Sequence, residues 1–203
     1  MQIIFVRHGQ TDENAANRYL GHTDPSLNDL GRQQIVNFTK QFPVYFSENI
    51  TSFYSSDLKR AQETAQIIRT SLLLNPPTPV PSLREMNFGD WECMTYERIM
   101  ETNPVLVTSW VDNPFEVSPP NGETLLALGA RFDTWLKQIL HQAGDVENIL
   151  IVCHGGPIRW FRSKWLQGDP KQFWNIEGIK HGTGIVVQYD KQTQEFSTVK
   201  FVT

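Results

Sequence analysis

The chain has 203 residues, of which 39% are hydrophobic and 20% are charged, the proportions of an ordinary globular protein. This length suits one well-buried core, so we expect a single domain over 1–203 that carries an inserted subregion. A net charge of -4 argues against a nucleic-acid binder or a membrane-surface binder, because both usually carry a basic excess.

The first predicted element is an apolar strand at 3–6 that runs directly into Arg7, His8 and Gly9. The apolar run before Arg7 is too short for a signal peptide or a membrane span, so we expect neither. Continuous apolar runs are typical of strands that are buried on both faces, as in a parallel sheet covered by helices. This strand therefore delivers a guanidinium and an imidazole to its carboxyl end.

Two helices and a second strand are predicted next. Asn28 is a suitable N-cap for the first helix, whose apolar positions are spaced three and four apart. A short strand is expected at 51–54, and residues 55–57 then supply capping side chains for a second helix that ends at 75–77. The buried stripe predicted for that helix consists of Leu58, Ala61, Ala65, Ile68 and Leu72.

The stretch 86–122 interrupts this alternation of strands and helices. It is rich in aromatic residues and prolines and has room for short helices near 95–101 and 104–111. An irregular segment of this length in a compact domain often forms a lid or a specificity region. We therefore expect a small helical lid here.

The clearest helix is predicted over 123–141, where apolar residues recur at intervals of three and four. It leads into a second apolar strand at 149–153, which runs into His154. Segments 184–189 and 195–202 alternate around a polar turn and suit an antiparallel edge hairpin. This order of elements favours an α/β sandwich.

Two cysteines bear on the cellular compartment. Cys153 lies in an apolar strand pattern, so we expect a reduced core thiol rather than a disulfide with Cys93. The cytoplasm is then the expected compartment. No cysteine and histidine cluster has the spacing of a zinc site.

Three polar fragments follow predicted strands: Arg7 with His8, the helix start that carries Arg60, and His154. In open α/β sheets, ligands bind just outside the carboxyl ends of the strands. We therefore expect the three fragments to meet in one cleft, where a few arginines bind an anion.

These side chains suit a phosphoryl group, which needs cations or donors around its non-bridging oxygens. Arg7 and Arg60 supply planar, permanently charged forks. Neutral imidazole is a nucleophile toward phosphorus, and adjacent guanidinium groups favour that neutral form. We assign His8 as the nucleophile and His154 as an oxygen-binding group, and the reverse assignment stays open.

Displacement of an alkoxide also needs a proton donor. Glu85 is the main candidate, and the alternative for it is a surface ion pair with Arg84. Asp12 and Glu13 are further candidates, although their position near a predicted helix start equally suits a capping or dipole role.

Taken in order along the chain, the motifs resemble the histidine phosphatase superfamily, the phosphoglycerate-mutase-like proteins. The matching segments are 7–11, Asn14, 17–21, 56–61, 83–85, 88–92 and 154–155. One departure is Cys93, where family members often carry glycine, and it bears on the local backbone turn rather than on the chemistry.

The resemblance implies a three-layer α/β/α sandwich with a mostly parallel central sheet, a phosphohistidine intermediate on His8, and neither metal nor cofactor. It also implies that Glu85 acts as acid and then as base. The catalytic residues implied by it are His8, Glu85, Arg7, Arg60 and His154. The substrate-binding residues implied by it are Arg7, Asn14, Leu20, Gly21, Arg60, His154 and Gly155.

Within the superfamily the choice lies between phosphatase and mutase. Mutases of this family carry an insertion with extra arginines, whereas residues between Glu85 and Gly122 include one arginine, Arg98. Hydrolysis of a small-molecule phosphomonoester is therefore favoured. A non-catalytic phosphate-binding module is the alternative from another class.

Segments 19–24, 88–92 and 120–124 look most similar to α-ribazole-5'-phosphate phosphatases. Lid aromatics would either stack on a benzimidazole-like ring or simply pack the lid; they are Trp91, Tyr96 and Trp110. A broad-specificity, phosphoserine or sugar-phosphate phosphatase is the alternative substrate assignment. Three histidines are expected to be polar surface residues: His22, His141 and His181. His22 has the alternative of reaching the rim of the pocket.

Overall fold

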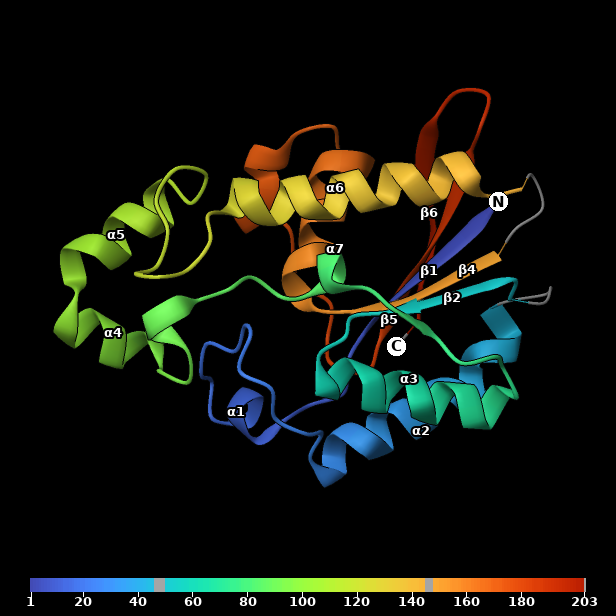
Figure 1. Cartoon of the computed structure of the whole chain (residues 1–203), viewed down its shortest axis with the longest axis horizontal. Helices are drawn as coiled ribbons and strands as arrows, with labels where there is room; N and C mark the ends of the chain where they lie inside the picture. The colour runs from blue at the N-terminus through green and yellow to red at the C-terminus, as the bar shows by residue number, and fades with distance from the viewer. Residues whose placement is uncertain (46–49, 145–147, 203) are drawn as a thin grey trace.

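The computed structural model describes residues 1–45, 50–144 and 148–202. Within these residues, six strands form one mixed sheet in the order β3-β2-β4-β1-β5-β6 (Figure 1). The strands are β1 (Gln2–Arg7), β2 (Ser52–Ser55), β3 (Thr78–Pro79), β4 (Asn148–Cys153), β5 (Gly184–Asp190) and β6 (Glu195–Val202). The first four run parallel, and β5 and β6 form the predicted antiparallel edge hairpin.

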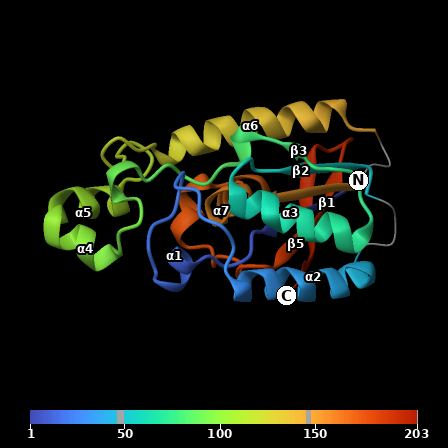
Figure 2. The ribbon, with the colours of Figure 1, turned by 60° about the horizontal axis from the view of Figure 1, so that its bottom comes forward.

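Helices cover both faces of this sheet, so the predicted α/β/α sandwich is confirmed. Helices α2 (Asp29–Tyr45) and α3 (Lys59–Leu72) lie on one face, and α6 (Leu125–Gln142) and α7 (Gly155–Phe161) lie on the other (Figures 1 and 2). Successive residues of β1 point to opposite faces and join separate apolar clusters. Both faces being buried explains why β1 reads as a continuous apolar run.

The register of the sheet brings the polar fragments together. Arg7 pairs with Cys153 at the ends of β1 and β4, so His8 and His154 follow at the same edge. Ser55 of β2 pairs with Val152, which places the start of α3 beside them. The site therefore follows from strand pairing.

The stretch 86–122 extends beyond this end of the sheet (Figure 1). It carries a 3-10 turn, η2 (Gly89–Trp91), and the two predicted helices α4 (Tyr96–Thr102) and α5 (Pro104–Asp112). Cys93 adopts φ +62°, the left-handed conformation that glycine favours. The glycine-like turn is therefore kept with a cysteine side chain.

The remaining short elements connect these parts. They are α1 (Asp12–Ala15), η1 (Pro81–Leu83), η3 (Arg162–Leu166) and η4 (Pro170–Trp174). No helix in the described ranges is both long and apolar enough to cross a membrane. Cys93 and Cys153 are both free thiols, and burial raises the pKa of Cys153.

Capping agrees with the prediction for one helix and only in part for another. Asn28 accepts the backbone N–H of Gly31 at 2.8 Å, as expected of the N-cap of α2. Helix α3 has Leu58 as its N-cap residue, and the carboxylate of Asp24 accepts the N–H of Lys59 at 2.6 Å. Of the predicted capping residues 55–57, Ser56 contributes, because its Oγ accepts the N–H of Leu58 at 3.3 Å, but the N–H of Lys59 is bound by a carboxylate from a distant loop.

Candidate active site

Four side chains from the three predicted fragments converge at this sheet edge. The ring centroids of His8 and His154 lie 4.9 Å apart. The Nε of Arg60 donates to Nε2 of His8 at 3.3 Å. Arg7 adds a second guanidinium, and together with Arg60 it lowers the pKa of His8 after the larger effect of burial.

The hydrogen bonds of His8 define its tautomer. Nδ1 lies 2.7 Å from the carbonyl oxygen of Gly9, which can only accept, so Nδ1 carries the proton. Nε2 then presents a lone pair, and it is this atom that accepts from Arg60. Burial, Arg60 and Arg7 hold the pKa of His8 well below its usual value. The ring is thus neutral, with an unprotonated nitrogen beside two cations.

His154 is fully buried at the N-terminus of α7. Its Nε2 lies 2.8 Å from Oγ of Ser56, and its Nδ1 has no hydrogen-bond partner among the described residues. Burial, followed by the charge of Arg60, lowers the pKa of His154 well below its usual value. A neutral imidazole with a spare nitrogen suits hydrogen bonding to an oxyanion.

Arg60 is fully buried without a direct ion-pair partner in the described part of the chain. Its Nη1 and Nη2 donate to the carbonyl oxygens of Thr23 and Gly21 at 2.9 and 2.6 Å. Burial lowers the pKa of Arg60, and the charge of Glu85 opposes that effect. Neutral carbonyls orient the guanidinium and leave its charge uncompensated by direct contact.

The loop that supplies these carbonyls is held by one carboxylate. Glu92 accepts four backbone N–H groups, those of Gly21, His22, Thr23 and Phe88. Burial would raise the pKa of Glu92, but the hydrogen bonds to it, those from the N–H groups of Thr23 and His22 foremost, together outweigh burial and lower that pKa. We call Glu92 with residues 21–23 the Glu92 clamp.

Arg7 is held by a different segment of the chain. Its Nη1 donates to the carbonyl oxygen of Ile179 at 2.8 Å, and its buried Nε has no partner among the described residues. A Cβ at Gly155 would lie 3.3 Å from Cζ of Arg7, so glycine leaves room for the guanidinium. Burial lowers the pKa of Arg7, and Glu85 opposes this effect.

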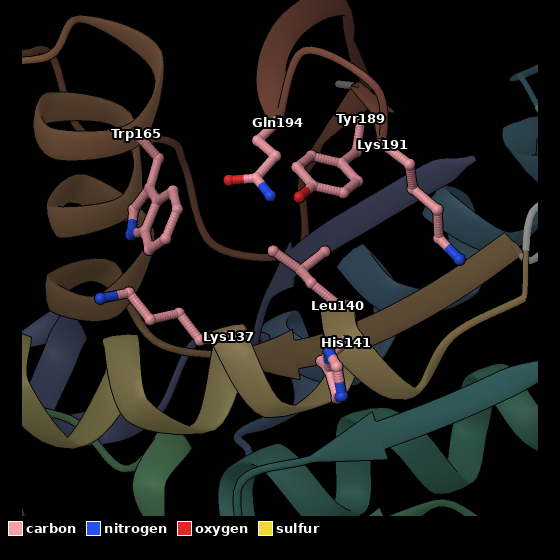
Figure 3. A pocket seen from close by; sticks show the side chains of 7 residues that line it. All are labelled: Lys137, Leu140, His141, Trp165, Tyr189, Lys191 and Gln194. Atoms are coloured by element: carbon pink, nitrogen blue, oxygen red, sulfur yellow. The ribbon is translucent and has the colours of Figure 1, made fainter.

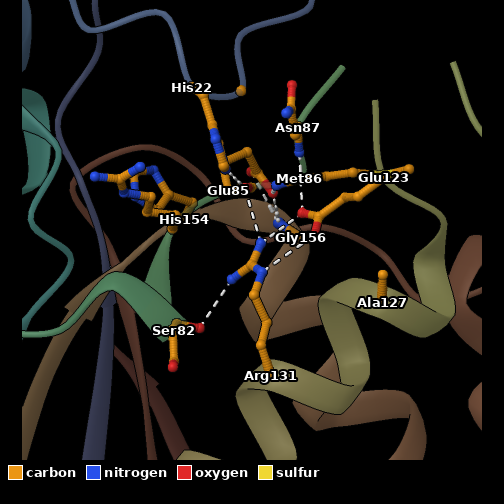
Figure 4. A network of polar contacts seen from close by, with 12 residues as sticks. His22, Ser82, Glu85, Met86, Asn87, Glu123, Ala127, Arg131, His154 and Gly156 are labelled. Carbon is orange, nitrogen blue, oxygen red and sulfur yellow. Dashed lines mark hydrogen bonds and ion pairs between the residues drawn. The ribbon is translucent and has the colours of Figure 1, made fainter. Parts of the chain in front are cut away.

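Glu85 reaches the site through a network that includes α6 (Figure 4). Its carboxylate accepts the N–H groups of Gly156 at 3.0 Å and of Met86 at 2.8 Å. Arg131 donates to the carbonyl oxygen of Glu85 at 2.9 Å and pairs with Glu123 at 2.6 Å. Arg131 of α6 therefore holds the segment that carries Glu85.

The alternative surface pair between Glu85 and Arg84 is wrong. Arg84 makes a two-pronged ion pair with Asp57, at 2.8 and 2.6 Å. Neighbouring residues 84 and 85 point to different partners, which leaves the Glu85 carboxylate facing the cavity.

Other predicted binding residues lie around this centre with less direct contacts. The side-chain oxygen of Asn14 accepts the N–H of Thr11 in the capping box of α1, and no bond joins it to the two histidines. Leu20 is buried, and Gly21 contacts the site through the carbonyl that Arg60 binds. Asp12 and Glu13 occupy the first turn of α1, which is the dipole position considered for them.

His181, expected on the surface, lies beside the site instead, and His22 contacts the segment that carries Glu85, in agreement with the rim position considered for it. The ring of His181 lies 5.4 Å from that of His8, and burial followed by Arg7 and Arg60 lowers the pKa of His181 to about 3. His22 donates from Nε2 to the carbonyl oxygen of Glu85. His141 is exposed, as predicted. His181 follows no strand, so its sequence context gave no sign of its position.

A cavity of about 210 Å³ opens beside Arg7, Glu85 and Gly155. Aromatic residues form much of its wall: Tyr19, Phe88, Trp110, Phe173 and Trp174. Of the three lid aromatics considered, Trp110 lines this cavity, Trp91 packs in the core, and Tyr96 is exposed. Arg159 of α7 also lines it and was not predicted.

A larger cavity, about 450 Å³, lies elsewhere between α6 and the β5–β6 turn (Figure 3). Its lining residues are Lys137, Leu140, His141, Trp165, Tyr189, Lys191 and Gln194. None of the residues predicted to act on a phosphoryl group is among them. The smaller cavity is therefore the one that adjoins the convergent polar groups.

Several known proteins are similar to this chain. Phosphoglycerate mutase-like protein 4 of Arabidopsis thaliana is 38% identical over 78% of the chain and 68% of its own length. The adenosylcobalamin/alpha-ribazole phosphatase of Escherichia coli (strain K12) is 26% identical over 98% and 94%. The metal-independent phosphoserine phosphatase of Arabidopsis thaliana is 32% identical over 78% and 66%.

The fold also matches solved structures. The alpha-ribazole phosphatase of Shigella flexneri superimposes with a TM-score of 0.87 at 24% identity, over 100% of this chain and 96% of that one. The family comparison extends over residues 3–201, nearly the whole sequence. The chain belongs to the histidine phosphatase superfamily (branch 1).

Proposed function

We propose that the protein hydrolyses phosphomonoesters through a phosphohistidine on Nε2 of His8. The observation that carries the proposal is the neutral His8 ring, whose Nε2 lone pair lies among the guanidinium groups of Arg7 and Arg60. Such an arrangement combines a nucleophile with the cations that bind the oxygens of a phosphoryl group.

In the first step the Nε2 lone pair attacks phosphorus, and the bond from phosphorus to the ester oxygen breaks. Arg7, Arg60 and His154 donate to the three non-bridging oxygens as their charge redistributes. Substrate binding must displace the bond between Arg60 and His8, because Nε2 has to be free to attack. Arg60 keeps its carbonyl contacts during this exchange.

Protonated Glu85 gives its proton to the departing alkoxide in this step. The resulting carboxylate then accepts a proton from the water that attacks phosphorus, and the bond from phosphorus to Nε2 breaks. The N–H groups of Gly156 and Met86 hold the carboxyl group in place throughout. One carboxyl thus acts as acid and then as base, and no step requires a metal ion.

Hydrolysis is favoured over mutase activity by the charges in the lid. Arg98, the arginine within 86–122, lies exposed and pairs with Glu101 at 2.9 Å. It is therefore not directed at a second phosphate. A mutase would need further cations to retain a bisphosphorylated intermediate long enough to return its phosphate.

The residues that line the cavity suit two substrate candidates. One is α-ribazole 5'-phosphate. The aromatic wall of the cavity suits a flat ring, and the E. coli α-ribazole phosphatase aligns with almost the whole chain. A phosphomonoester that bears a carboxylate, such as phosphoserine, is the second candidate, and the guanidinium of Arg159 in the same cavity favours it. A panel of substrates ranked by kcat/KM decides between them.

The test of the chemistry is hydrolysis of p-nitrophenyl phosphate by the wild type and by His8→Ala, with and without EDTA. We expect EDTA to leave the wild-type rate intact and His8→Ala to fall to the buffer blank. Mass spectrometry after a rapid alkaline quench should detect phosphate on the peptide that contains His8. Wild-type rates equal to the blank, with phosphate still bound, would instead identify a non-catalytic binding module.

A further inference from the structure

Arg159 lies on the wall of the cavity that adjoins the phosphoryl site. It projects from α7, four residues after Gly155, and therefore from the same face of the helix. A rise of about 6 Å, slightly more than one helical turn, separates the two positions along the axis. Arg159 is thus placed on the side where the leaving group of a phosphomonoester would lie.

The guanidinium of Arg159 has aromatic neighbours but no acceptor. Its Cζ lies 5.5 Å from the ring centroid of Phe173 and 5.7 Å from that of Trp174. Within the described residues, it makes no hydrogen bond and no ion pair. These aromatic contacts use none of its N–H groups in a hydrogen bond, so the N–H groups stay available to an acceptor.

The other cavity arginine is bonded differently. Arg7 donates to the carbonyl oxygen of Ile179, which orients its guanidinium. Arg159 is partly buried, and burial lowers its pKa while the charge of Glu85 opposes that effect. A desolvated cation without an acceptor gains from an incoming anion.

We propose that Arg159 binds a carboxylate on the leaving group, so that phosphorylated hydroxy acids and amino acids are the preferred substrate class. This inference rests on the proposed function. Two parallel N–H bonds to the two carboxylate oxygens match the guanidinium edge. A neutral leaving group, such as that of α-ribazole 5'-phosphate, gives Arg159 no anion to bind.

The test compares phosphoserine with phosphoethanolamine, which differ by the carboxylate alone. We expect the wild type to have at least about tenfold higher kcat/KM for phosphoserine, the size of one charged hydrogen-bonded contact. Arg159→Met should reduce this ratio about tenfold. Arg159→Gln replaces it if the methionine variant does not fold.

The matched control is Arg162→Met, three residues further along the chain. Arg162 donates to the carbonyl oxygen of Glu177, stacks over Phe201, and lines a different cavity. This variant should keep the wild-type ratio of phosphoserine to phosphoethanolamine.

Two failures are distinguishable. If p-nitrophenyl phosphate is hydrolysed in a His8-dependent way but the ratio is the same in wild type and Arg159→Met, the inference about Arg159 is wrong. The inference is equally wrong if the wild type shows no preference for phosphoserine over phosphoethanolamine. If no phosphomonoester is hydrolysed above the His8→Ala rate, the proposed function itself has failed.

Discussion

A single methyl group at position 156 would occupy the place of a carboxylate oxygen. A Cβ there would lie 2.1 Å from Oε1 of Glu85, whereas the N–H of Gly156 now donates to that carboxylate. A side chain at this position would therefore push the Glu85 carboxyl group out of the place that it holds beside the site.

At the same scale, the charge of Arg60 is expected to set the pH range in which His8 is a nucleophile. After burial, Arg60 is the largest cause of the lowered pKa of His8. His8 attacks only when neutral, so activity is lost as pH falls through this pKa. The wild-type acid limb should therefore lie well below the usual histidine pKa of about 6.5.

Replacing Arg60 by methionine removes the positive charge, so the pKa of His8 should rise and the acid limb of kcat/KM should move to higher pH. Overall kcat/KM should also fall by about two orders of magnitude, as for other charge-stabilising donors. A pH profile with p-nitrophenyl phosphate measures both effects. Arg98→Met, on the exposed face of α4, is the control, and an acid limb unmoved in Arg60→Met would contradict the assignment.

At the scale of elements, the Glu92 clamp shows how one carboxylate organises a loop and a helix. The clamp fixes the carbonyls of Gly21 and Thr23, and these carbonyls orient Arg60 at the start of α3. Asp24, the next residue, caps α3 through Lys59. The same loop thus positions both the helix and its guanidinium.

We expect Glu92→Gln to weaken this arrangement, because an amide has one acceptor oxygen for four N–H groups and introduces two donors of its own. The free energy of unfolding should fall by about 2 kcal/mol, the scale for lost hydrogen bonds to a charged group. Affinity for inorganic phosphate should fall as well, since Arg60 loses its orientation. Urea unfolding and calorimetric titration measure the two effects.

Asp90→Asn is the matched control for this variant, because Asp90 lies in the same turn but is exposed and contacts Asn121. It should change neither quantity appreciably. A Glu92→Gln protein with wild-type stability and phosphate affinity would show that the loop is held by other contacts.

These elements also show what sequence patterns can predict. Continuous apolar runs identified β1 and β4, because a strand that is buried on both faces is apolar at every position. Apolar residues spaced three and four apart identified α6, because a helix that is buried along one stripe has this pattern. The two-residue strand β3 and the cap from Asp24 produce no such pattern in the sequence. They depend on contacts between segments far apart in the chain.

The residues of the candidate site also fall into a predictable group and an unpredictable group. His8, Arg60 and His154 were predictable because each follows a strand that ends at one sheet edge. Arg159 and His181 were not, because the first lies inside a helix and the second in an irregular loop, and only packing brings them to the cavity. Sequence reasoning therefore finds groups placed by strand order more readily than groups placed by packing.

At the scale of the whole molecule, the site gathers three imidazoles that are kept neutral, of which His8 and His154 are buried and His181 is partly buried. Burial is the largest cause of the lowered pKa at His8, His154 and His181. In the unfolded chain each histidine regains a pKa of about 6.5. Below about pH 6.5 the unfolded state therefore binds more protons than the folded state, so the free energy of unfolding must fall as pH falls.

For His181 the pH range of this loss of stability is defined, because its pKa is lowered to about 3. The stability that its neutral form contributes is present above pH 6.5 and is lost progressively as pH falls toward 3, at up to about 1.4 kcal/mol per pH unit. His181→Asn removes this proton linkage. Between pH 6 and pH 4, the free energy of unfolding of the variant should then fall less steeply with pH than that of the wild type. The two slopes should differ by roughly 1 kcal/mol per pH unit.

Urea unfolding at a series of pH values measures the slope, and His141→Asn, which alters an exposed imidazole, should keep the wild-type slope. Equal slopes in His181→Asn and wild type would mean that His181 takes up its proton within the folded protein.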